Sequence, residues 1–370
     1  MNSLIEKKVV IALSGGVDSS VAALLLKKEG YRVYGIHMIN WDSQLNELEM
    51  NSECESLSKD RKYAEEISKK LEIPFFIYNF TFEYWNYVFK PFISLFNKNL
   101  IGNPDILCNS EIKFGVLLNK IKRVFGPDVF LATGHYAKII TSKNNFLLGT
   151  CKENKKDQTY FLSKLTQNQL KEIIFPLSEI DSKEKVREIA KQNNFPNWNK
   201  KGSRGICFIG KRNFYSFISK YIEPKEGSII EIESKEYLGK HKGLCFYSMN
   251  QRKGQLVSGG REKYYVCGKN EKDSTLYVCG ESTREKYLKK KYSLVENLHW
   301  INKQPEIGEN IFLKFKHTPT FISGIIRKIN NRGIELMHES CFSTSPGQYI
   351  VFYSGDKKLC LGCGIYRNSF

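Results

Sequence analysis

A seven-residue motif near the N-terminus combines residue types that bind phosphate groups. It reads Ser14-Gly15-Gly16-Val17-Asp18-Ser19-Ser20 and directly follows the apolar run Lys8–Leu13. At a strand-to-helix turn, free backbone amides and serine hydroxyls can bind the phosphates of a nucleotide. Glycine lets the backbone approach such an anion closely. The motif is neither the GxxxxGK[ST] nor the GxGxxG pattern, and a glycine-rich turn with a helix cap is the alternative interpretation.

Asp18 is the unusual member of this motif, because a carboxylate would repel phosphate. Mg²⁺ bound between Asp18 and the phosphates would remove the repulsion. The positive end of the helix dipole would reduce it if Asp18 only caps the helix. We favour the magnesium role for Asp18.

Two cysteines are candidate nucleophiles. Cys108 follows the segment Asn103–Leu107 and precedes a predicted helix, Ser110–Phe125. The start of a helix lowers the pKa of a thiol and increases the thiolate fraction. Cys207 lies in the apolar segment Gly205–Gly210. Either cysteine taken alone would more often be a buried packing residue.

Alternating strand and helix patterns must position these residues. Lys8–Leu13 and Val33–Met38 are predicted parallel strands joined by a helix over Val21–Lys28, which Gly30 ends. This βαβ unit indicates an α/β fold with a doubly wound parallel sheet. Further predicted helices cover Lys59–Lys70, Phe82–Phe96, Ser110–Phe125 and Lys183–Gln192, with strands at Pro74–Tyr78 and Val129–Ala132.

The pattern changes after about residue 210, where short β-rich runs alternate with turns. These runs are Ile229–Ile232, Lys263–Cys267, Thr275–Cys279, Asn310–Phe315, Ser323–Ile329 and Gln348–Tyr353. Their spacing predicts two small β-rich, barrel-like domains. The lysine-rich segment Glu285–Lys291 is the predicted boundary between them. We therefore expect domains at residues 1–210, 211–284 and 285–370.

The overall charge favours a polyanionic partner. The 370 residues carry a formal net charge of +18, which suits nucleic acid or an anionic membrane surface. No apolar run reaches the roughly 20 residues of a membrane helix. The N-terminus lacks the features of a signal or transit peptide. We expect a cytoplasmic protein whose ten cysteines are mostly reduced.

The seven-residue motif, in its strand-to-helix context, resembles the PP-loop of ATP pyrophosphatases. The paired cysteines, with their flanking residues, resemble the active-site cysteines of the tRNA-specific 2-thiouridylase family. Five more segments agree with that family in the same order. They are Ala132–Tyr136, Lys156–Leu162, Phe175–Leu177, Gln251–Gly254 and Ser345–Gln348. The resemblance covers essentially the whole chain and implies an adenine nucleotide alpha-hydrolase-like catalytic domain.

The resemblance implies an ATP site and a site for the substrate base. ATP would contact Ala12, Leu13, Ser14, Gly15, Gly16, Val17, Asp18, Ser19, Met38 and Gly134. The segment Asn103, Pro104 and Asp105 would receive a flipped-out target base, whose carbonyl becomes reachable only outside the stack. Asp105 would also handle protons.

The resemblance further implies the reaction: ATP-dependent 2-thiolation of the tRNA wobble uridine. AMP transfer would turn the uracil 2-oxygen into a good leaving group. Cys207 would carry a persulfide that supplies the sulfur. Cys108 would release that sulfur, ending in a Cys108–Cys207 disulfide. The products would be 2-thiouridine, AMP and pyrophosphate.

Partners also follow from the resemblance. tRNA contacts would come from His135, Lys156, Asp157, Gln158, Lys316, His317 and Gln348. The substrates would be the lysine, glutamate and glutamine tRNAs. A sulfur carrier or cysteine desulfurase would supply the persulfide, and no membrane partner is expected.

The sequence departs from the family pattern at several positions. Gly202 stands where an acidic residue is usual, Lys316-His317 replaces an Arg-Tyr pair, and Cys363 replaces a glycine. Ser248-Met249-Asn250 replaces the more usual Thr-Ile-Gly. These changes affect the expected tRNA contacts rather than the reaction.

Two alternative functions and one alternative site remain open. Cytidine thiolation is disfavoured because the catalytic region lacks the paired CxxC motifs of those enzymes. A catalytically inactive RNA-binding protein is disfavoured by the intact Asp18, Cys108 and Cys207. The residues His338, Cys341, Cys360 and Cys363 have spacings compatible with zinc, although we expect no structural metal.

Overall fold

The computed structural model describes residues 7–42, 52–152, 156–202, 214–252 and 262–370. The chain divides into two compact units. Unit 1 comprises residues 1–89, 104–212 and 357–361, and unit 2 comprises residues 90–103, 213–356 and 362–370. Cys207 and its flanking residues lie outside the described residues. No helix in the described ranges is long and apolar enough to span a membrane.

Unit 1 is built on a parallel sheet with the strand order β3-β2-β1-β4-β7. Its strands are β1 (Lys8–Ala12), β2 (Arg32–Ile39), β3 (Phe75–Asn79), β4 (Phe130–Ala132) and β7 (Ile173–Ile174). All four strand pairings are parallel. Parallel strands buried on both faces read as continuous apolar runs, and Val9, Val10 and Ile11 of β1 are fully buried.

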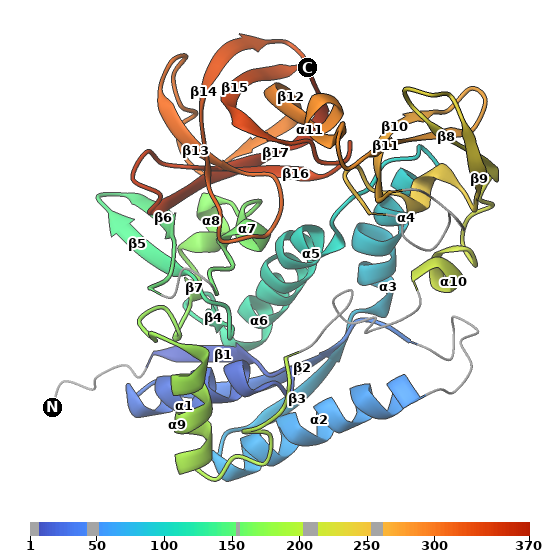
Figure 1. Ribbon diagram of the computed structural model, residues 1–370. Coiled ribbons are helices and arrows are strands. Elements are labelled where there is room, and N and C mark those ends of the chain that lie inside the picture. The colour runs from blue at the N-terminus through green and yellow to red at the C-terminus, as the bar shows by residue number, and fades with distance from the viewer. Residues whose placement is uncertain (1–6, 43–51, 153–155, 203–213, 253–261) are drawn as a thin grey trace, which may run out of the picture. The chain divides into compact units, whose positions relative to one another are not determined.

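Helices cover both faces of this sheet, as Figure 1 shows. On one face lie α1 (Val17–Lys28), α2 (Ser52–Lys70) and α9 (Lys183–Gln192). They share a core with β1 that includes Val21, Ile67 and Val186. On the other face lie α5 (Pro104–Leu107) and α6 (Leu118–Phe125), joined by the π-helix η2 (Cys108–Leu117). The predicted doubly wound α/β sheet is confirmed.

The remaining elements of unit 1 are short. They are α3 (Thr81–Tyr84), the π-helix η1 (Trp85–Phe89), α7 (Thr159–Leu162), α8 (Gln167–Leu170) and the hairpin β5 (Lys138–Ser142) with β6 (Asn145–Gly149). The hairpin was missed in the sequence. Strand β6 pairs with the beginning of β17 (Leu359–Ser369), through Leu359 and Cys360. A short C-terminal segment therefore completes unit 1.

Unit 2 contains a small sheet and a closed barrel. The sheet has the order β10-β11-β8-β9, with β8 (Gly227–Glu231), β9 (Tyr237–His241), β10 (Tyr264–Asn270) and β11 (Thr275–Gly280). The other elements before the barrel are α4 (Lys90–Phe96), α10 (Phe214–Ile218), the 3-10 helix η3 (Leu244–Phe246) and α11 (Arg284–Leu288). The described part of the central region thus forms a sheet.

The barrel follows the order β12-β15-β14-β13-β16-β17, and β12 also pairs with β17. Its strands are β12 (Lys289–Trp300), β13 (Asn310–Lys314), β14 (Ile322–Asn330), β15 (Gly333–Phe342), β16 (Tyr349–Tyr353) and β17. Pairing of the first strand with the last removes exposed edges. The predicted C-terminal barrel is confirmed.

Candidate active site

The predicted nucleotide-binding motif forms the turn between β1 and α1. Ser14 Oγ and Ser19 Oγ lie 3.2 Å apart, and Ser14 Oγ accepts a hydrogen bond from the Gly16 nitrogen at 3.4 Å. The Ser20 hydroxyl donates to the Gly16 carbonyl oxygen at 2.9 Å. Gly15 has a φ of +73°, a value that favours glycine. The turn therefore places hydroxyls and the first amides of a 12-residue helix where an anion can bind.

Side chains from α2 and from the segment after α9 support this turn. The Asn197 amide donates to the Gly15 carbonyl oxygen and to Ser20 Oγ, each at 3.0 Å. The Lys200 ammonium donates to the same carbonyl at 3.1 Å and forms an ion pair with Asp60 of α2. The roles of Asn197, Lys200 and Asp60 could not be predicted from the sequence, because they depend on contacts between distant segments.

Asp18, in the first turn of α1, has two partners. Its Oδ1 atom accepts a hydrogen bond from the Tyr136 hydroxyl at 2.8 Å and forms an ion pair with Lys183 of α9. Burial, and secondarily the Asp18 carboxylate, raises the pKa of Tyr136 above its usual value, so this phenol stays protonated as a donor. A protein cation thus offsets the carboxylate charge, an arrangement that the sequence did not suggest.

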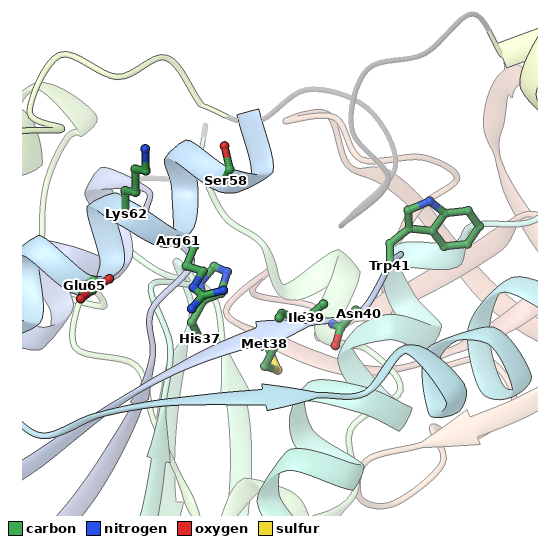
Figure 2. A pocket seen from close by; sticks show the side chains of 9 residues that line it. All are labelled: His37, Met38, Ile39, Asn40, Trp41, Ser58, Arg61, Lys62 and Glu65. Atoms are coloured by element: carbon green, nitrogen blue, oxygen red, sulfur yellow. The ribbon is translucent and has the colours of Figure 1, made fainter. Parts of the chain in front are cut away.

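A cavity of about 440 Å³ lies between the end of β2 and α2 (Figure 2). Its lining comprises His37, Met38, Ile39, Asn40, Trp41, Ser58, Arg61, Lys62 and Glu65. Met38, the predicted adenine contact, is among them. Asn40 is 1% exposed, and neither atom of its side-chain amide has a hydrogen-bond partner within the described residues. A buried amide without a partner is costly to the fold, so Asn40 is available for a ligand.

His37 lines the same cavity, and its imidazole is neutral. Burial lowers its pKa below the usual value. Its Nδ1 atom lies 2.8 Å from the Leu13 carbonyl oxygen, which can only accept a hydrogen bond. The proton therefore resides on Nδ1, and Nε2 is an acceptor.

Comparisons with known proteins identify the family. Three family models match in order along the chain: "tRNA methyl transferase HUP domain" over residues 7–211, "tRNA methyl transferase PRC-barrel domain" over 215–280 and "Aminomethyltransferase beta-barrel domain" over 290–366. The "tRNA-specific 2-thiouridylase MnmA" of Ureaplasma parvum is 41% identical, covering 99% of this chain and 95% of its own. The protein of the same name from Mycoplasmopsis synoviae is 40% identical, covering 99% and 96%.

The chain belongs to the tRNA-specific 2-thiouridylase (MnmA) family. The family and enzyme class predicted from the sequence are confirmed by these relatives. The chain also spans 54% of the length of the "Trifunctional protein RibF/MnmA" of Mycoplasmoides gallisepticum, to which it is 41% identical. Among solved structures, a 4-thiouridine synthetase–RNA complex with bound ATP has a TM-score of 0.33 at 17% identity, covering 58% of this chain and 49% of that one.

The predicted nucleophile Cys108 is fully buried. The helical stretch begins at Pro104, and Cys108 follows the four residues of α5. The expectation that Cys108 stands at the helix start is therefore wrong, because helix formation extends through Pro104 and Asp105. The helix dipole acts mainly within the first turn, so it gives less support to the Cys108 thiolate than expected. The distance between Cys108 and Cys207 is not described, because Cys207 lies outside the described residues.

The segments around His135 and Lys156 belong to unit 1. Burial lowers the pKa of His135 well below its usual value, and Nδ1 lies 2.8 Å from Thr133 Oγ1. Asp157 is 2% exposed and accepts a hydrogen bond from Thr159 Oγ1 at 2.6 Å. The neighbouring Lys156 is exposed. The tRNA contacts of these residues stay predictions.

The predicted tRNA contacts of unit 2 lie on the barrel. Lys316 and His317 are exposed between β13 and β14, and Gln348 is half-buried just before β16. The alternative zinc site is not assembled in the described part of the chain, where no three His, Cys, Asp or Glu side chains could hold a metal. His338 Nε2 instead lies 2.9 Å from Ser293 Oγ.

Proposed function

We propose that this protein converts the wobble uridine of tRNA to 2-thiouridine, with release of AMP and pyrophosphate. The observation that carries the proposal is the anion-binding turn between β1 and α1, in a chain whose near full-length relatives are named 2-thiouridylases. The expected substrates are the lysine, glutamate and glutamine tRNAs. We place the reaction in the cytoplasm, where Cys108 and Cys207 would be reduced.

In the first step, the uracil 2-oxygen attacks the α-phosphate of ATP and pyrophosphate leaves. The amides and hydroxyls of the turn bind the phosphates, while Met38 and Asn40 bind the adenine. Such groups, fixed before the reaction, stabilise the charge that develops on the leaving group. Asn103, Pro104 and Asp105 hold the target base, and Asp105 accepts or returns protons.

Mg²⁺ fits this site as a partner of the nucleotide. Asp18 would supply one carboxylate, and Mg²⁺ typically binds one or two carboxylates together with substrate phosphates. Bound there, Mg²⁺ would neutralise phosphate charge. If Asp18 is this ligand, Asp18→Asn will raise the Mg²⁺ concentration needed for pyrophosphate release. The alternative that Asp18 is the helix cap is wrong, because Gly16 is the N-cap residue and the Asp18 side chain in the first turn bonds to Tyr136 and Lys183.

In the second step, sulfur replaces the adenylylated oxygen at carbon 2. Cys207 carries a persulfide received from a sulfur-carrier protein or cysteine desulfurase. Either the terminal sulfur attacks carbon 2 directly, or Cys108 first releases it as hydrosulfide, which then attacks. AMP leaves with the former uracil oxygen. In both routes the Cys108 thiolate attacks the Sγ atom of Cys207 and breaks its bond to the outer sulfur, which leaves as hydrosulfide or stays on carbon 2 as the sulfur of 2-thiouridine. A thiol reductant then reopens the resulting Cys108–Cys207 disulfide.

We also propose the division into a catalytic domain (1–210), a central β-rich domain (211–284) and a tRNA-binding barrel (285–370). The ranges of the three family models support these boundaries. Leu359 and Cys360 qualify this division, because they pair with β6 in unit 1.

The proposal is tested by nucleoside analysis of tRNA from cells with and without the protein. We expect 2-thiouridine to disappear without it, and to return with the wild-type chain but with neither Cys207→Ser nor Cys108→Ser. Cys108→Ser should still accept persulfide at Cys207. The half-buried Cys341 provides the control, since Cys341→Ser should restore thiolation. Loss of 2-thiocytidine or of a methylated base instead of 2-thiouridine would overturn the proposal.

A further inference from the structure

Lys183 lies beside the nucleotide-binding turn, although it is distant from it in sequence. It is the first residue of α9, whose N-cap residue Ser182 accepts a hydrogen bond from the Lys185 nitrogen at 3.1 Å. Val186 of α9 packs in the core shared with α1. This packing brings the Lys183 ammonium to the Asp18 carboxylate of α1.

Two groups hold the Lys183 ammonium, the Asp18 carboxylate and the Tyr136 ring. Its side chain is only 15% exposed, and removing an ammonium from water requires compensating charge and hydrogen bonds. Asp18 supplies the charge. The Lys183 Nζ atom lies 6.0 Å from the centroid of the Tyr136 ring, over its face. The Tyr136 hydroxyl donates a hydrogen bond to the same oxygen of Asp18. The cation is therefore preorganised at the start of α1.

We propose that Lys183 is a phosphate-binding residue of the nucleotide site. The inference rests on the proposed use of ATP at the β1–α1 turn. An ammonium has three donors, and Asp18 is its one hydrogen-bond partner among the described residues, so donors remain for a phosphate oxygen. As pyrophosphate departs, a fixed cation at this position stabilises the increasing negative charge.

The competing explanation is that Lys183 is only a structural counter-ion for Asp18. In that case its removal harms nucleotide binding indirectly, by leaving a bare carboxylate in an anion-binding turn. A double variant separates the two roles, because Asp18→Asn removes the carboxylate charge while keeping a side chain of the same shape.

The first experiment measures nucleotide binding to the full chain without tRNA. For Lys183→Gln we expect the affinities for ATP and inorganic pyrophosphate to fall by about 10- to 100-fold, the usual range for one charge-assisted hydrogen bond. Affinity for adenosine, which has no phosphate, should stay unchanged. Lys183→Arg keeps the charge and should lose less ATP affinity than Lys183→Gln. The matched control is Lys185→Gln, on the same helix, whose ammonium pairs with Glu188.

The second experiment compares Asp18→Asn/Lys183→Gln with Lys183→Gln. We expect the double variant to bind ATP no more tightly than the single variant. Recovery of wild-type ATP affinity would assign Lys183 a structural role and overturn the inference. The inference would also be overturned if Lys183→Gln left the affinity for ATP unchanged, or if it lowered the affinities for ATP and adenosine equally. These readouts do not involve thiolation, so failure of the protein to form 2-thiouridine would overturn the proposed function alone.

Discussion

Gly134 packs directly against the backbone of Ser19. A methyl group added to the Gly134 α-carbon would lie 2.6 Å from the Ser19 nitrogen and 2.7 Å from the Asp18 carbonyl carbon. Both atoms belong to the first turn of α1, so no flexible side chain can move aside. The glycine therefore lets the segment after β4 pack closely against the β1–α1 turn.

We predict that Gly134→Ala displaces this turn. Overpacking of this kind typically lowers the free energy of unfolding by about 1–3 kcal/mol, and ATP affinity should fall with it. Gly202→Ala is the control, because an added methyl group there meets no atom of the described residues within 4 Å. Chemical denaturation and calorimetric ATP titration measure both effects. Wild-type ATP affinity in Gly134→Ala would contradict the prediction.

Asn40 offers a test of the cavity beside Met38. We predict that Asn40→Leu raises the free energy of unfolding of the nucleotide-free protein by about 1 kcal/mol. The substitution replaces with apolar atoms a buried amide that has no hydrogen-bond partner among the described residues. The same substitution should weaken ATP binding. Thermal unfolding with and without ATP measures both changes, and the stabilisation by ATP should shrink.

The matched comparison is Asn109, a buried asparagine whose amide is satisfied. It donates to the Phe161 carbonyl oxygen at 3.0 Å and accepts from Lys113 at 2.9 Å. Asn109→Leu should therefore lower the free energy of unfolding by about 1–3 kcal/mol. If both substitutions destabilise the protein equally, Asn40 does not carry an unmet hydrogen-bonding group.

Local patterns in the sequence predicted the catalytic fold well. The apolar run of β1 and the helix Lys183–Gln192 are found as predicted. Helix α1 begins at Val17 rather than Val21, because the polar residues Asp18, Ser19 and Ser20 obscured its first turn. Strand β12 was missed, because its lysine-rich beginning was interpreted as a domain boundary.

Contacts between distant segments could not be predicted in the same way. The motif Ser14–Ser20 predicted a candidate phosphate-binding turn because all its groups are adjacent in sequence. The cations that contact this turn, Lys183 and Lys200, come from segments more than 160 residues away. Many lysines are spread along this basic chain, so no local pattern distinguishes these two.

His135 should contribute to the pH dependence of stability. Burial holds its folded-state pKa well below 6.5, so the unfolded chain binds the proton more readily. Stability is therefore retained above pH 6.5 and is lost as the pH falls below it. Burial also lowers the pKa values of His37, His241 and His338. These histidines therefore also reduce the free energy of unfolding as the pH falls. His135→Gln should reduce the loss of unfolding free energy between pH 7 and pH 5. An unchanged pH profile would contradict this assignment.

Lys316 and His317 lie exposed on the barrel, between β13 and β14. If Lys316 and His317 contact tRNA, affinity will fall steeply with salt, with a slope of about −0.7 to −0.9 in log K against log salt for each neutralised phosphate. Lys316→Gln should make this slope shallower by about one such unit and leave ATP affinity unchanged.

A point variant is preferable to removal of all residues after 285, since that would also remove Leu359 and Cys360, which pair with β6. Filter-binding measurements across a salt series provide the test, with Lys303→Gln, an exposed lysine paired with Glu306, as the control. Equal slopes for wild type and Lys316→Gln would exclude a phosphate contact at this lysine.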